Sequence, residues 1–297
     1  GAMALERLAK LPAAAEIASE FRYRNPCIDP SALYFAVSQS GETADTLGAV
    51  REVVIKGGRA MGIVNVVGSS IARTCGRGVY TYSGPEMAVA STKAFTSQIT
   101  ALYLLTLMLA RTRNLSPHEG RELGEALLGV PDLIGRYLAD PGPIDELVRW
   151  VTRSRFTMFL GRGFSAPVAA EGALKLMEVA YLPCLAYPSG EMKHGPIALL
   201  ERDMPIIVIA PNDSTRAKTL SNLQECKARG ARIALIHSKG DPAASQADLA
   251  IEVPDTQEWL SPLVTVLPLQ LLAYRAGLAL GRDIDRPRNL AKSVTVE

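Results

Sequence analysis

The sequence predicts an α/β protein of two lobes, each built on a parallel β-sheet. Three observations predict this fold class. Short apolar runs rich in strand-forming residues alternate with segments of helical periodicity. The alternation is interrupted at 140–143, where Asp-Pro-Gly-Pro breaks it, and then resumes. The order of elements in the second half repeats that of the first, which indicates an internal duplication of one α/β unit.

The first lobe is expected to span residues 1–115, and its elements follow one another closely. An apolar run at 32–37 is followed by a polar loop and a helical pattern that ends at Gly57-Gly58. The predicted strands are 32–37, 60–66 and 78–82, and the predicted helices are 44–56 and 91–111.

A helical linker over 116–145 leads into a second lobe over 146–285, and a tail without clear periodicity covers 286–297. The linker has a helical pattern at 117–138, and a further helix starts at 144. The second lobe is predicted to contain strands at 156–160, 204–209, 232–237 and 249–253, and helices at 167–180, 213–229 and 259–280, the last interrupted near Pro268.

The two halves align from the strand at 33–37, which matches 205–209, to Gly57-Gly58, which matches Gly230. Continued towards the N-terminus, the alignment places Met3 opposite Leu174. The first half then has no counterpart of 156–173, a strand, a glycine-containing loop and the start of a helix. We therefore expect the first lobe to lack its first strand.

Composition excludes several classes of protein. Hydrophobic residues make up 48% and charged residues 21% of the chain, which is typical of globular rather than disordered proteins. A net charge of +2 gives no electrostatic basis for binding nucleic acid or an anionic membrane. The uncharged segments 94–110 and 260–274 are shorter than the ~20 residues of a membrane span, so we expect buried helices. Four widely spaced cysteines predict neither a disulfide framework nor a metal site, and favour the cytoplasm.

The loop Ser38-Gln39-Ser40-Gly41-Glu42-Thr43 lies between a predicted strand and a predicted helix. Its hydroxyl groups and the N–H groups that open the helix can bind a phosphate. An ordinary turn with Ser and Thr as helix caps is the alternative, and the pattern alone leaves both open. The matching loop at 210–215 contains a proline and an aspartate instead, so only one copy is equipped for an anion.

Other candidate residues are ambiguous by position. Glu171, Lys175 and Glu178 share one helix face, either as a surface ion pair or as part of a covered site. His194, in a glycine-flanked loop, is either structural or a proton-transfer group. Lys292 lies in the tail, where a lysine is normally a solvated charge.

Five motifs together resemble those of the isomerase half of the glucosamine-6-phosphate synthase family, which is built from two sugar-isomerase (SIS) domains. The resemblance covers nearly the whole chain from Leu5, and its most specific parts are the 190–196 loop and the terminal run. The motifs are SQSGETADT at 38–46, ASTKAFT at 90–96, EGALK at 171–175 with Glu178, GEMKHGP at 190–196 and PRNLAKSVTVE at 287–297.

The resemblance implies two αβα lobes and a fructose 6-phosphate site. It implies phosphate binding by Ser38, Gln39, Ser40 and Thr43, and backbone contacts to the sugar from Val89 and Ala291. It also implies that Glu178 moves a proton between C1 and C2, with Glu171 and Lys175 supporting that helix face. His194 would open the sugar ring from the partner subunit of a homodimer, and Lys292 would form an imine with the open-chain ketone.

The resemblance also sets limits. The family carries a glutaminase domain, which supplies ammonia and is absent from this sequence, and a Gly-Thr-Ser phosphate loop after the strand that the duplication shows to be missing. We therefore expect weak isomerase activity at best from this chain. A non-catalytic sugar-phosphate-binding SIS module is the alternative function, and Glu178, His194 and Lys292 together favour an enzyme. No cofactor is expected, and a dinucleotide-binding protein is disfavoured because no G-x-G-x-x-G follows a strand. No metal is expected either, because the four cysteines have no paired spacing.

Overall fold

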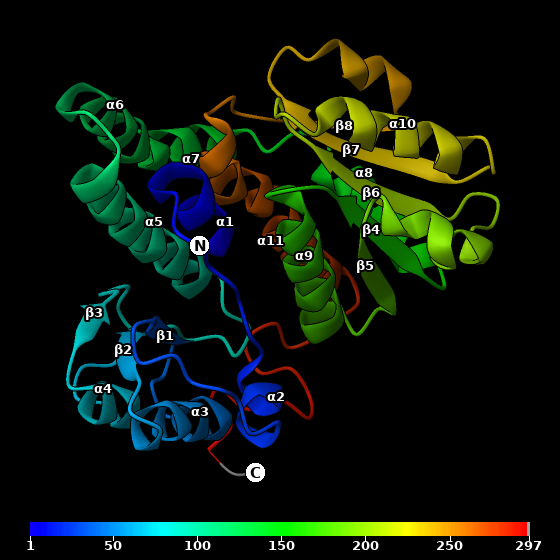
Figure 1. Ribbon diagram of the computed structural model, residues 1–297. Helices are drawn as coiled ribbons and strands as arrows, with labels where there is room; N and C mark the ends of the chain where they lie inside the picture. The colour runs from blue at the N-terminus through cyan, green and yellow to red at the C-terminus, as the bar shows by residue number, and fades with distance from the viewer. Residues whose placement is uncertain (296–297) are drawn as a thin grey trace. The chain divides into compact units, whose positions relative to one another are not determined.

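A computed structural model describes residues 1–295 of the chain (Figure 1). Its contacts divide the chain into two compact units. Unit 1 contains Gly1–Arg121 together with the segment from Arg288 onward, and unit 2 contains Glu122–Pro287. Each unit has its own sheet and its own core.

Unit 1 is built on a three-stranded parallel sheet in the order β1-β2-β3. Helices α3 and α4 lie on one face of this sheet and α5 on the other (Figure 1). The strands are β1 (Leu33–Ser38), β2 (Arg59–Val64) and β3 (Gly78–Tyr80). The helical segments are α1 (Ala2–Ala4), a π-helix (Leu5–Ala9), α2 (Ala18–Tyr23), α3 (Ala44–Ile55), α4 (Ser70–Cys75) and α5 (Lys93–Arg113).

The core of unit 1 is small. Val50 and Val53 of α3 pack with Val64 of β2 and Ile71 of α4 in one buried cluster. Strand β3 approaches β2 so closely that a Cβ on Gly78 would lie 2.0 Å from the Gly62 carbonyl oxygen, so only glycine fits there. This packing fixes the carboxyl ends of β1 and β2, where the polar loops begin.

Unit 2 contains a larger parallel sheet in the order β5-β4-β6-β7-β8. Its strands are β4 (Thr157–Gly161), β5 (Cys184–Pro188), β6 (Pro205–Ala210), β7 (Arg232–Ser238) and β8 (Leu249–Val253). Its helices are α7 (Val130–Ala139), α8 (Ile144–Arg153), α9 (Ser165–Ala180), α10 (Arg216–Lys227) and α11 (Ser261–Ala279), and the boundary between the units falls within α6 (Pro117–Leu128). Short 3-10 turns cover Glu191–His194, Pro196–Leu199, Pro242–Gln246 and Glu258–Leu260.

Both faces of the second sheet are covered, as in doubly wound α/β folds. Met158, Ile206 and Ile233 point to the face covered by α10, where Leu223 joins their cluster. The alternate strand residues face α9 and α11, which contact β4, β5, β7 and β8. All six residues of β6 are buried, which explains why its sequence is an unbroken apolar run.

The predicted fold class is confirmed: two parallel sheets are each covered by helices. Two local predictions need correction, and two short helices were not predicted. Residues 117–138 form two helices, α6 and α7, because Gly129 separates them. No interruption occurs at Pro268, which lies inside a continuous α11, because the surrounding core holds the helix despite the missing N–H. Finally, α2 and α4 were not predicted, since six residues are too few to show a period.

The first sheet has no strand equivalent to β4 within the described residues, as the duplication predicts. It also lacks an equivalent of β5, whose counterpart by the alignment is residues 12–17. In unit 2, β5 pairs with β4 alone. A segment without that neighbour has no ladder to join, which explains why residues 12–17 are not a strand.

Two helical segments are long and apolar enough to cross a membrane by length and composition, which is weak evidence by itself. Glu258–Ala279 is a core element, since 67% of its apolar window is buried in the protein. Lys93–Arg113 is buried over 33% of its window, with Leu104 and Met108 exposed. The prediction of a buried helix therefore holds for α11 and only in part for α5.

Candidate functional site

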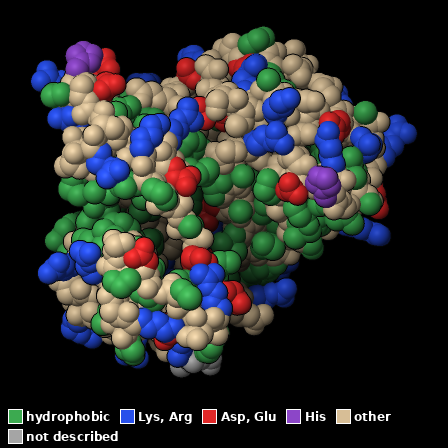
Figure 2. Space-filling model, viewed as in Figure 1, with side chains coloured by type: hydrophobic (Ala, Val, Ile, Leu, Met, Phe, Trp, Pro, Cys, Tyr) green, Lys and Arg blue, Asp and Glu red, His purple; other side chains and the backbone are tan. Residues whose placement is uncertain are grey.

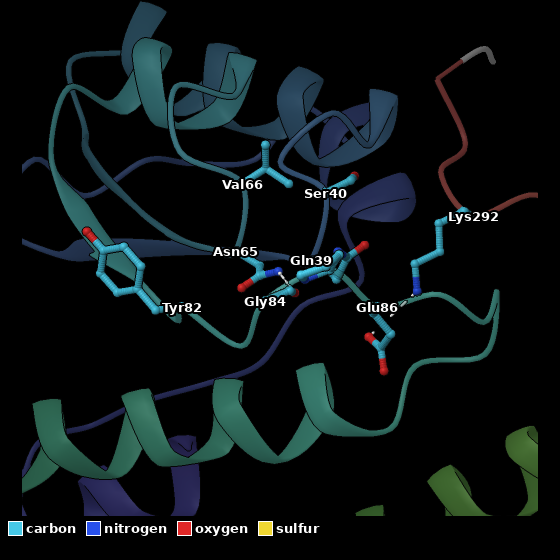
Figure 3. Close-up of a pocket in the computed structure, with 9 residues that line it drawn as sticks. Gln39, Ser40, Asn65, Val66, Tyr82, Gly84, Glu86 and Lys292 are labelled. Atoms are coloured by element: carbon cyan, nitrogen blue, oxygen red, sulfur yellow. Dashed lines mark hydrogen bonds and ion pairs between the residues drawn. The ribbon is translucent and has the colours of Figure 1, made fainter.

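A cavity of about 560 Å³ in unit 1 brings together residues that are far apart in the sequence (Figure 3). The loops after β1, β2 and β3 line it, and the C-terminal tail adds Lys292. Because parallel strands present their carboxyl ends at one sheet edge, loops from separate strands meet there. The lining residues are Gln39, Ser40, Asn65, Val66, Tyr82, Gly84, Pro85, Glu86 and Lys292.

The loop after β1 is held by its own hydroxyl groups. Ser38 Oγ accepts the N–H of Gly41 at 3.0 Å and lies 3.0 Å from Thr43 Oγ1. Ser40 Oγ accepts the N–H of Glu42 at 3.2 Å. Because the Ser38 and Ser40 oxygens accept from the backbone, each O–H group can still donate, either to Thr43 or Ser293 as in this structure or to an anion.

Gly41 permits the tight turn of this loop. Its φ is +69°, and a Cβ there would lie 2.0 Å from Ser69 Oγ. Glu42 does not line the cavity. It holds the loop against the start of α4, since its Oε1 accepts the N–H of Ser70 at 2.8 Å. Hydrogen bonds from Ser70 hold the pKa of Glu42 below its ordinary value.

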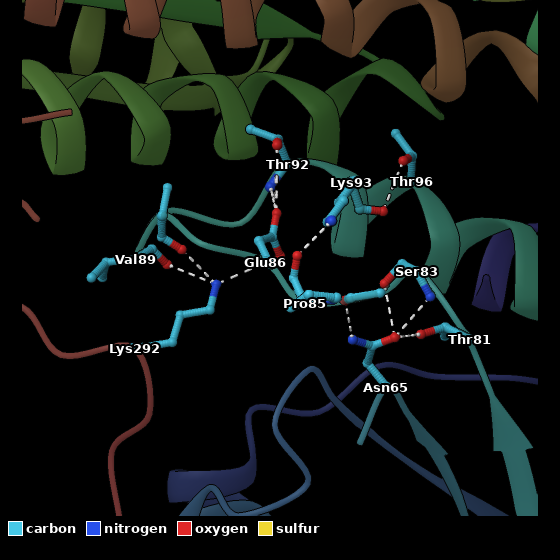
Figure 4. Close-up of polar contacts among 12 residues, drawn as sticks. Asn65, Thr81, Ser83, Pro85, Glu86, Val89, Thr92, Lys93, Thr96 and Lys292 are labelled. Atoms are coloured by element: carbon cyan, nitrogen blue, oxygen red, sulfur yellow. Dashed lines mark hydrogen bonds and ion pairs between the residues drawn. The ribbon is translucent and has the colours of Figure 1, made fainter. Parts of the chain in front are cut away.

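The C-terminal tail is bonded to the same loop. Ser293 Oγ lies 3.0 Å from Ser40 Oγ across 253 residues of sequence, and the N–H of Ala44 donates to the Val294 carbonyl at 3.1 Å. Lys292 Nζ donates to the carbonyl of Ala88 at 2.7 Å and lies 3.5 Å from that of Val89 (Figure 4). The tail thus places an amine beside the hydroxyl-rich loop.

Most of the predicted residues of unit 1 are therefore close together. Gln39, Ser40 and Lys292 line the cavity, while Ser38 and Thr43 support the loop behind it. Val89 contributes its carbonyl to Lys292, and the exposed Ala291 precedes that lysine in the tail.

The predicted residues of unit 2 form two groups. On α9, Lys175 is 5% exposed and its Nζ lies 2.5 Å from Glu178 Oε2 and 3.6 Å from Glu171 Oε1. Burial raises the pKa of Glu171 above its ordinary value, and the nearby Lys175 opposes that shift. These three side chains are a largely covered cluster of charges, unlike a solvated surface pair.

His194 is exposed at the end of the turn Glu191–His194. The turn is held by Met192, which is fully buried and whose sulfur lies 3.0 Å from that of Cys226. Lys193 Nζ forms an ion pair with Glu225 at 2.7 Å. These contacts hold the turn in place and leave the imidazole of His194 exposed to solvent.

Six of the nine residues lining the cavity were not predicted from the sequence, and two of them, Asn65 and Glu86, make polar contacts that shape its wall. Asn65 holds the loop after β3, since its Oδ1 accepts from Thr81 and Ser83 and its Nδ2 donates to the Gly84 carbonyl at 2.8 Å (Figure 4). Glu86, in the loop after β3, lies beside Lys292 of the C-terminal tail, with its Oε2 3.6 Å from the lysine Nζ. The only sequence signal for Glu86 was an acidic residue shortly before the start of a long helix.

The SIS domain family profile matches residues 1–108 and 152–280. The chain belongs to the SIS domain family. Its two SIS segments correspond to the two sheets described above.

Relatives of this SIS chain carry one recurring name. The chain is 47% identical over 298 residues to a glutamine–fructose-6-phosphate aminotransferase (isomerizing) of Chlorobaculum tepidum, and 45% identical over 299 residues to one of Thermus thermophilus. Both matches cover the whole chain and 48–50% of the relative. The chain therefore spans about half the length of the curated relatives it matches.

Solved structures agree with these matches. The C-terminal domain of a glucosamine-fructose-6-phosphate aminotransferase from Francisella tularensis is similar with a TM-score of 0.91 and 40% identity, over 96% of this chain and 81% of that one. A tagatose-6-phosphate ketose/aldose isomerase from Escherichia coli, at 16% identity and a TM-score of 0.76 over 97% of this chain and 81% of that one, shares the SIS fold alone.

Proposed function

We propose that the chain is the isomerase part of a glutamine–fructose-6-phosphate aminotransferase. It binds fructose 6-phosphate, interconverts ketose and aldose forms, and yields glucosamine 6-phosphate when a glutaminase domain supplies ammonia. The names of relatives at 45–47% identity support this proposal. The proposal divides the chain into a first SIS domain (1–115), a linker (116–145), a second SIS domain (146–285) and a catalytic tail (286–297).

One observation carries the proposal: the hydroxyl-rich loop and Lys292 line a single cavity, although 253 residues separate Ser40 from the adjacent Ser293. A volume of about 560 Å³ falls within the range of about 300–1,000 Å³ typical of small-molecule sites. A sugar phosphate needs both features, an anion cradle for the phosphate and an amine near the carbonyl carbon.

The proposed chemistry assigns a role to each group. Ser38, Gln39, Ser40 and Thr43 bind the phosphate, and the backbone of Val89 and Ala291 contacts the sugar. Lys292 forms an iminium at C2, which acidifies the C1 proton because the electron pair left behind can delocalise onto nitrogen.

The groups of unit 2 complete the reaction. Glu178 moves the proton between C1 and C2, with Lys175 and Glu171 maintaining the charge balance of α9. His194, exposed on its anchored turn, opens the sugar ring of the neighbouring subunit in a homodimer. The relatives' metabolic role supports a cytoplasmic location, and the substrates are fructose 6-phosphate and glucose 6-phosphate.

Borohydride trapping tests the proposal directly. The chain is incubated with fructose 6-phosphate, reduced, digested and analysed by mass spectrometry. We expect a sugar-phosphate adduct on Lys292 and none in Lys292→Arg, because arginine cannot form the imine. An adduct on Lys175 or Lys193 would contradict the assignment. Saturable binding without any adduct would favour the alternative function, a non-catalytic sugar-phosphate-binding SIS module.

A further inference from the structure

The wall of the cavity contains a buried carboxylate that the chemistry above does not use. The side chain of Glu86 is 4% exposed, and its Oε2 is buried without a hydrogen-bond partner, 3.6 Å from Lys292 Nζ (Figures 3 and 4). Placing a carboxylate in such a position costs free energy unless a positive charge faces it. Lys292 provides that charge.

Glu86 is fixed from behind. Its Oε1 accepts the N–H of Thr92 at 2.6 Å, and Thr92 is the N-cap of the 21-residue helix α5. Unpaired N–H groups and the helix dipole favour a negative charge at this end. Asn65 holds the preceding loop, and Lys93 Nζ donates to the Pro85 carbonyl at 2.6 Å. The carboxylate therefore needs no rearrangement to face the cavity.

Within the described part of the chain, three oxygen atoms lie close to the nitrogen of Lys292, and they differ in charge. Two are the carbonyl oxygens of Ala88 and Val89, and the third is Oε2 of Glu86. The carbonyl groups can orient the amine through its hydrogens, but only Glu86 carries a charge that compensates a positive nitrogen. When the nitrogen bonds to the sugar, the carbonyl groups can therefore affect only its orientation, whereas Glu86 also affects the stability of its positive charge.

We propose that Glu86 is a positioning residue, the fixed counter-charge of the Lys292 nitrogen before and after that nitrogen bonds to the sugar. This inference rests on the proposed function. When the ammonium and the C2 ketone condense, nitrogen gives up two protons, the ketone oxygen takes both and leaves as water, and a C=N bond replaces C=O. The nitrogen carries one positive charge at both ends of this step. A single immobile carboxylate therefore stabilises ammonium and iminium alike, relative to the neutral amine.

Glu86→Gln keeps the shape of the side chain and removes its charge. We expect borohydride trapping of fructose 6-phosphate on Lys292 to fall by about tenfold or more, because borohydride reduces the positively charged iminium and the glutamine no longer stabilises it relative to the neutral imine. Acetylation of Lys292 by acetic anhydride without sugar is expected to rise, because Glu86 no longer holds the amine in an ion pair. Glu86→Asp retains the charge and should move both rates back towards the wild-type values.

Glu52→Gln is the matched control, since Glu52 also pairs with a lysine, Lys56 at 2.7 Å, but on the outer surface of α3. The inference is overturned if Glu86→Gln and Glu52→Gln give equal trapping and equal acetylation, or if Glu86→Asp behaves as Glu86→Gln. If the wild-type chain takes no sugar label, the proposed function fails, and acetylation alone decides the inference: a rise in Glu86→Gln supports the pairing, and an unchanged rate overturns it.

Discussion

Strands β1 and β6 occupy equivalent places in the two copies of the duplicated unit, yet only β6 has a neighbour on each side. Strand β6 pairs with β4 and β7, and all its residues are buried. Among residues 1–295, strand β1 pairs with β2 alone. Its Val37 is 38% exposed, whereas the equivalent Ile209 of β6 is 0% exposed. One apolar pattern therefore produces a core strand or an edge strand, depending on what lies beside it.

The loops that follow these strands differ in chemistry. In the second copy, Ser214 donates its N–H and its hydroxyl to Glu258, at 3.2 and 2.8 Å. Burial also raises the pKa of Asp213 there, with the Glu258 charge adding to the effect. A phosphate at that loop would meet two acidic side chains, whereas the first-copy loop opens onto a cavity with an amine. Both copies keep the same framework, and we expect only the first-copy loop to bind an anion.

The largest expected contrast is between lysine substitutions in the two strands. Ile209→Lys buries an unpaired charge and should lower the free energy of unfolding by about 4 kcal/mol or more. Val37→Lys, at the sheet edge, should lower it by less than about 1 kcal/mol, because the ammonium reaches solvent. Urea unfolding followed by far-ultraviolet circular dichroism measures both. Equal losses would mean that the free edge of β1 is covered in solution.

A smaller contrast is expected between the loops. Ser40→Ala with Thr43→Ala removes two hydroxyl donors, and each charge-assisted hydrogen bond contributes about 1.5–3 kcal/mol. The affinity for fructose 6-phosphate should therefore fall roughly a hundredfold or more by calorimetry. Ser214→Ala with Thr215→Ala is the matched control in the second copy and should leave the affinity unchanged. A comparable loss in the control would show that both copies bind the sugar phosphate.

The smallest expected effect is a pH dependence of the free energy of unfolding, caused by the carboxylates whose hydrogen bonds hold these loops. In the second copy Arg216 hydrogen-bonds Asp241, and this bond holds the pKa of Asp241 below its ordinary value. The folded pKa thus lies below the unfolded one, about 3.9, so the stabilisation is present above that pH and is lost as the pH falls through the folded pKa.

Asp241→Asn should cost about 1 kcal/mol at neutral pH and make the loss of stability below pH 4 shallower. Urea unfolding at pH 3 to 7 measures both. In the first copy, hydrogen bonds from Ser70 lower the pKa of Glu42. Glu42→Gln should therefore also make the loss of stability at low pH shallower. If Asp241→Asn loses stability at low pH as steeply as the wild type, Asp241 does not contribute to the pH dependence.

Local patterns predicted most of the elements because apolar runs and helical spacing are properties of neighbouring residues. The strands at β6 and β7 were evident for that reason. The continuous path of α11 through Pro268 was not, since packing from other elements overrides the local preference. The missing first strand was predictable only because the second copy provides a template.

The candidate site was only partly predictable. The Ser38–Thr43 loop carries its signal locally, in hydroxyl groups before a helix. Lys292 does not, because its partners Ala88 and Val89 lie about 200 residues earlier, and only the family resemblance singled it out. Glu86 and Asn65 carry no spacing pattern at all, and their importance depends on where three separate loops meet.

The return of the tail to unit 1 has a consequence for the order of folding during synthesis. Unit 2 is contiguous in sequence and can fold as soon as Pro287 has left the ribosome, whereas unit 1 is split around it. The wall that carries Lys292, and the bonds from Ser293 and Val294 to the loop and to α3, cannot form until the tail emerges. The amine therefore joins its cavity only after the hydroxyl-rich loop and the whole of unit 2 have been synthesised.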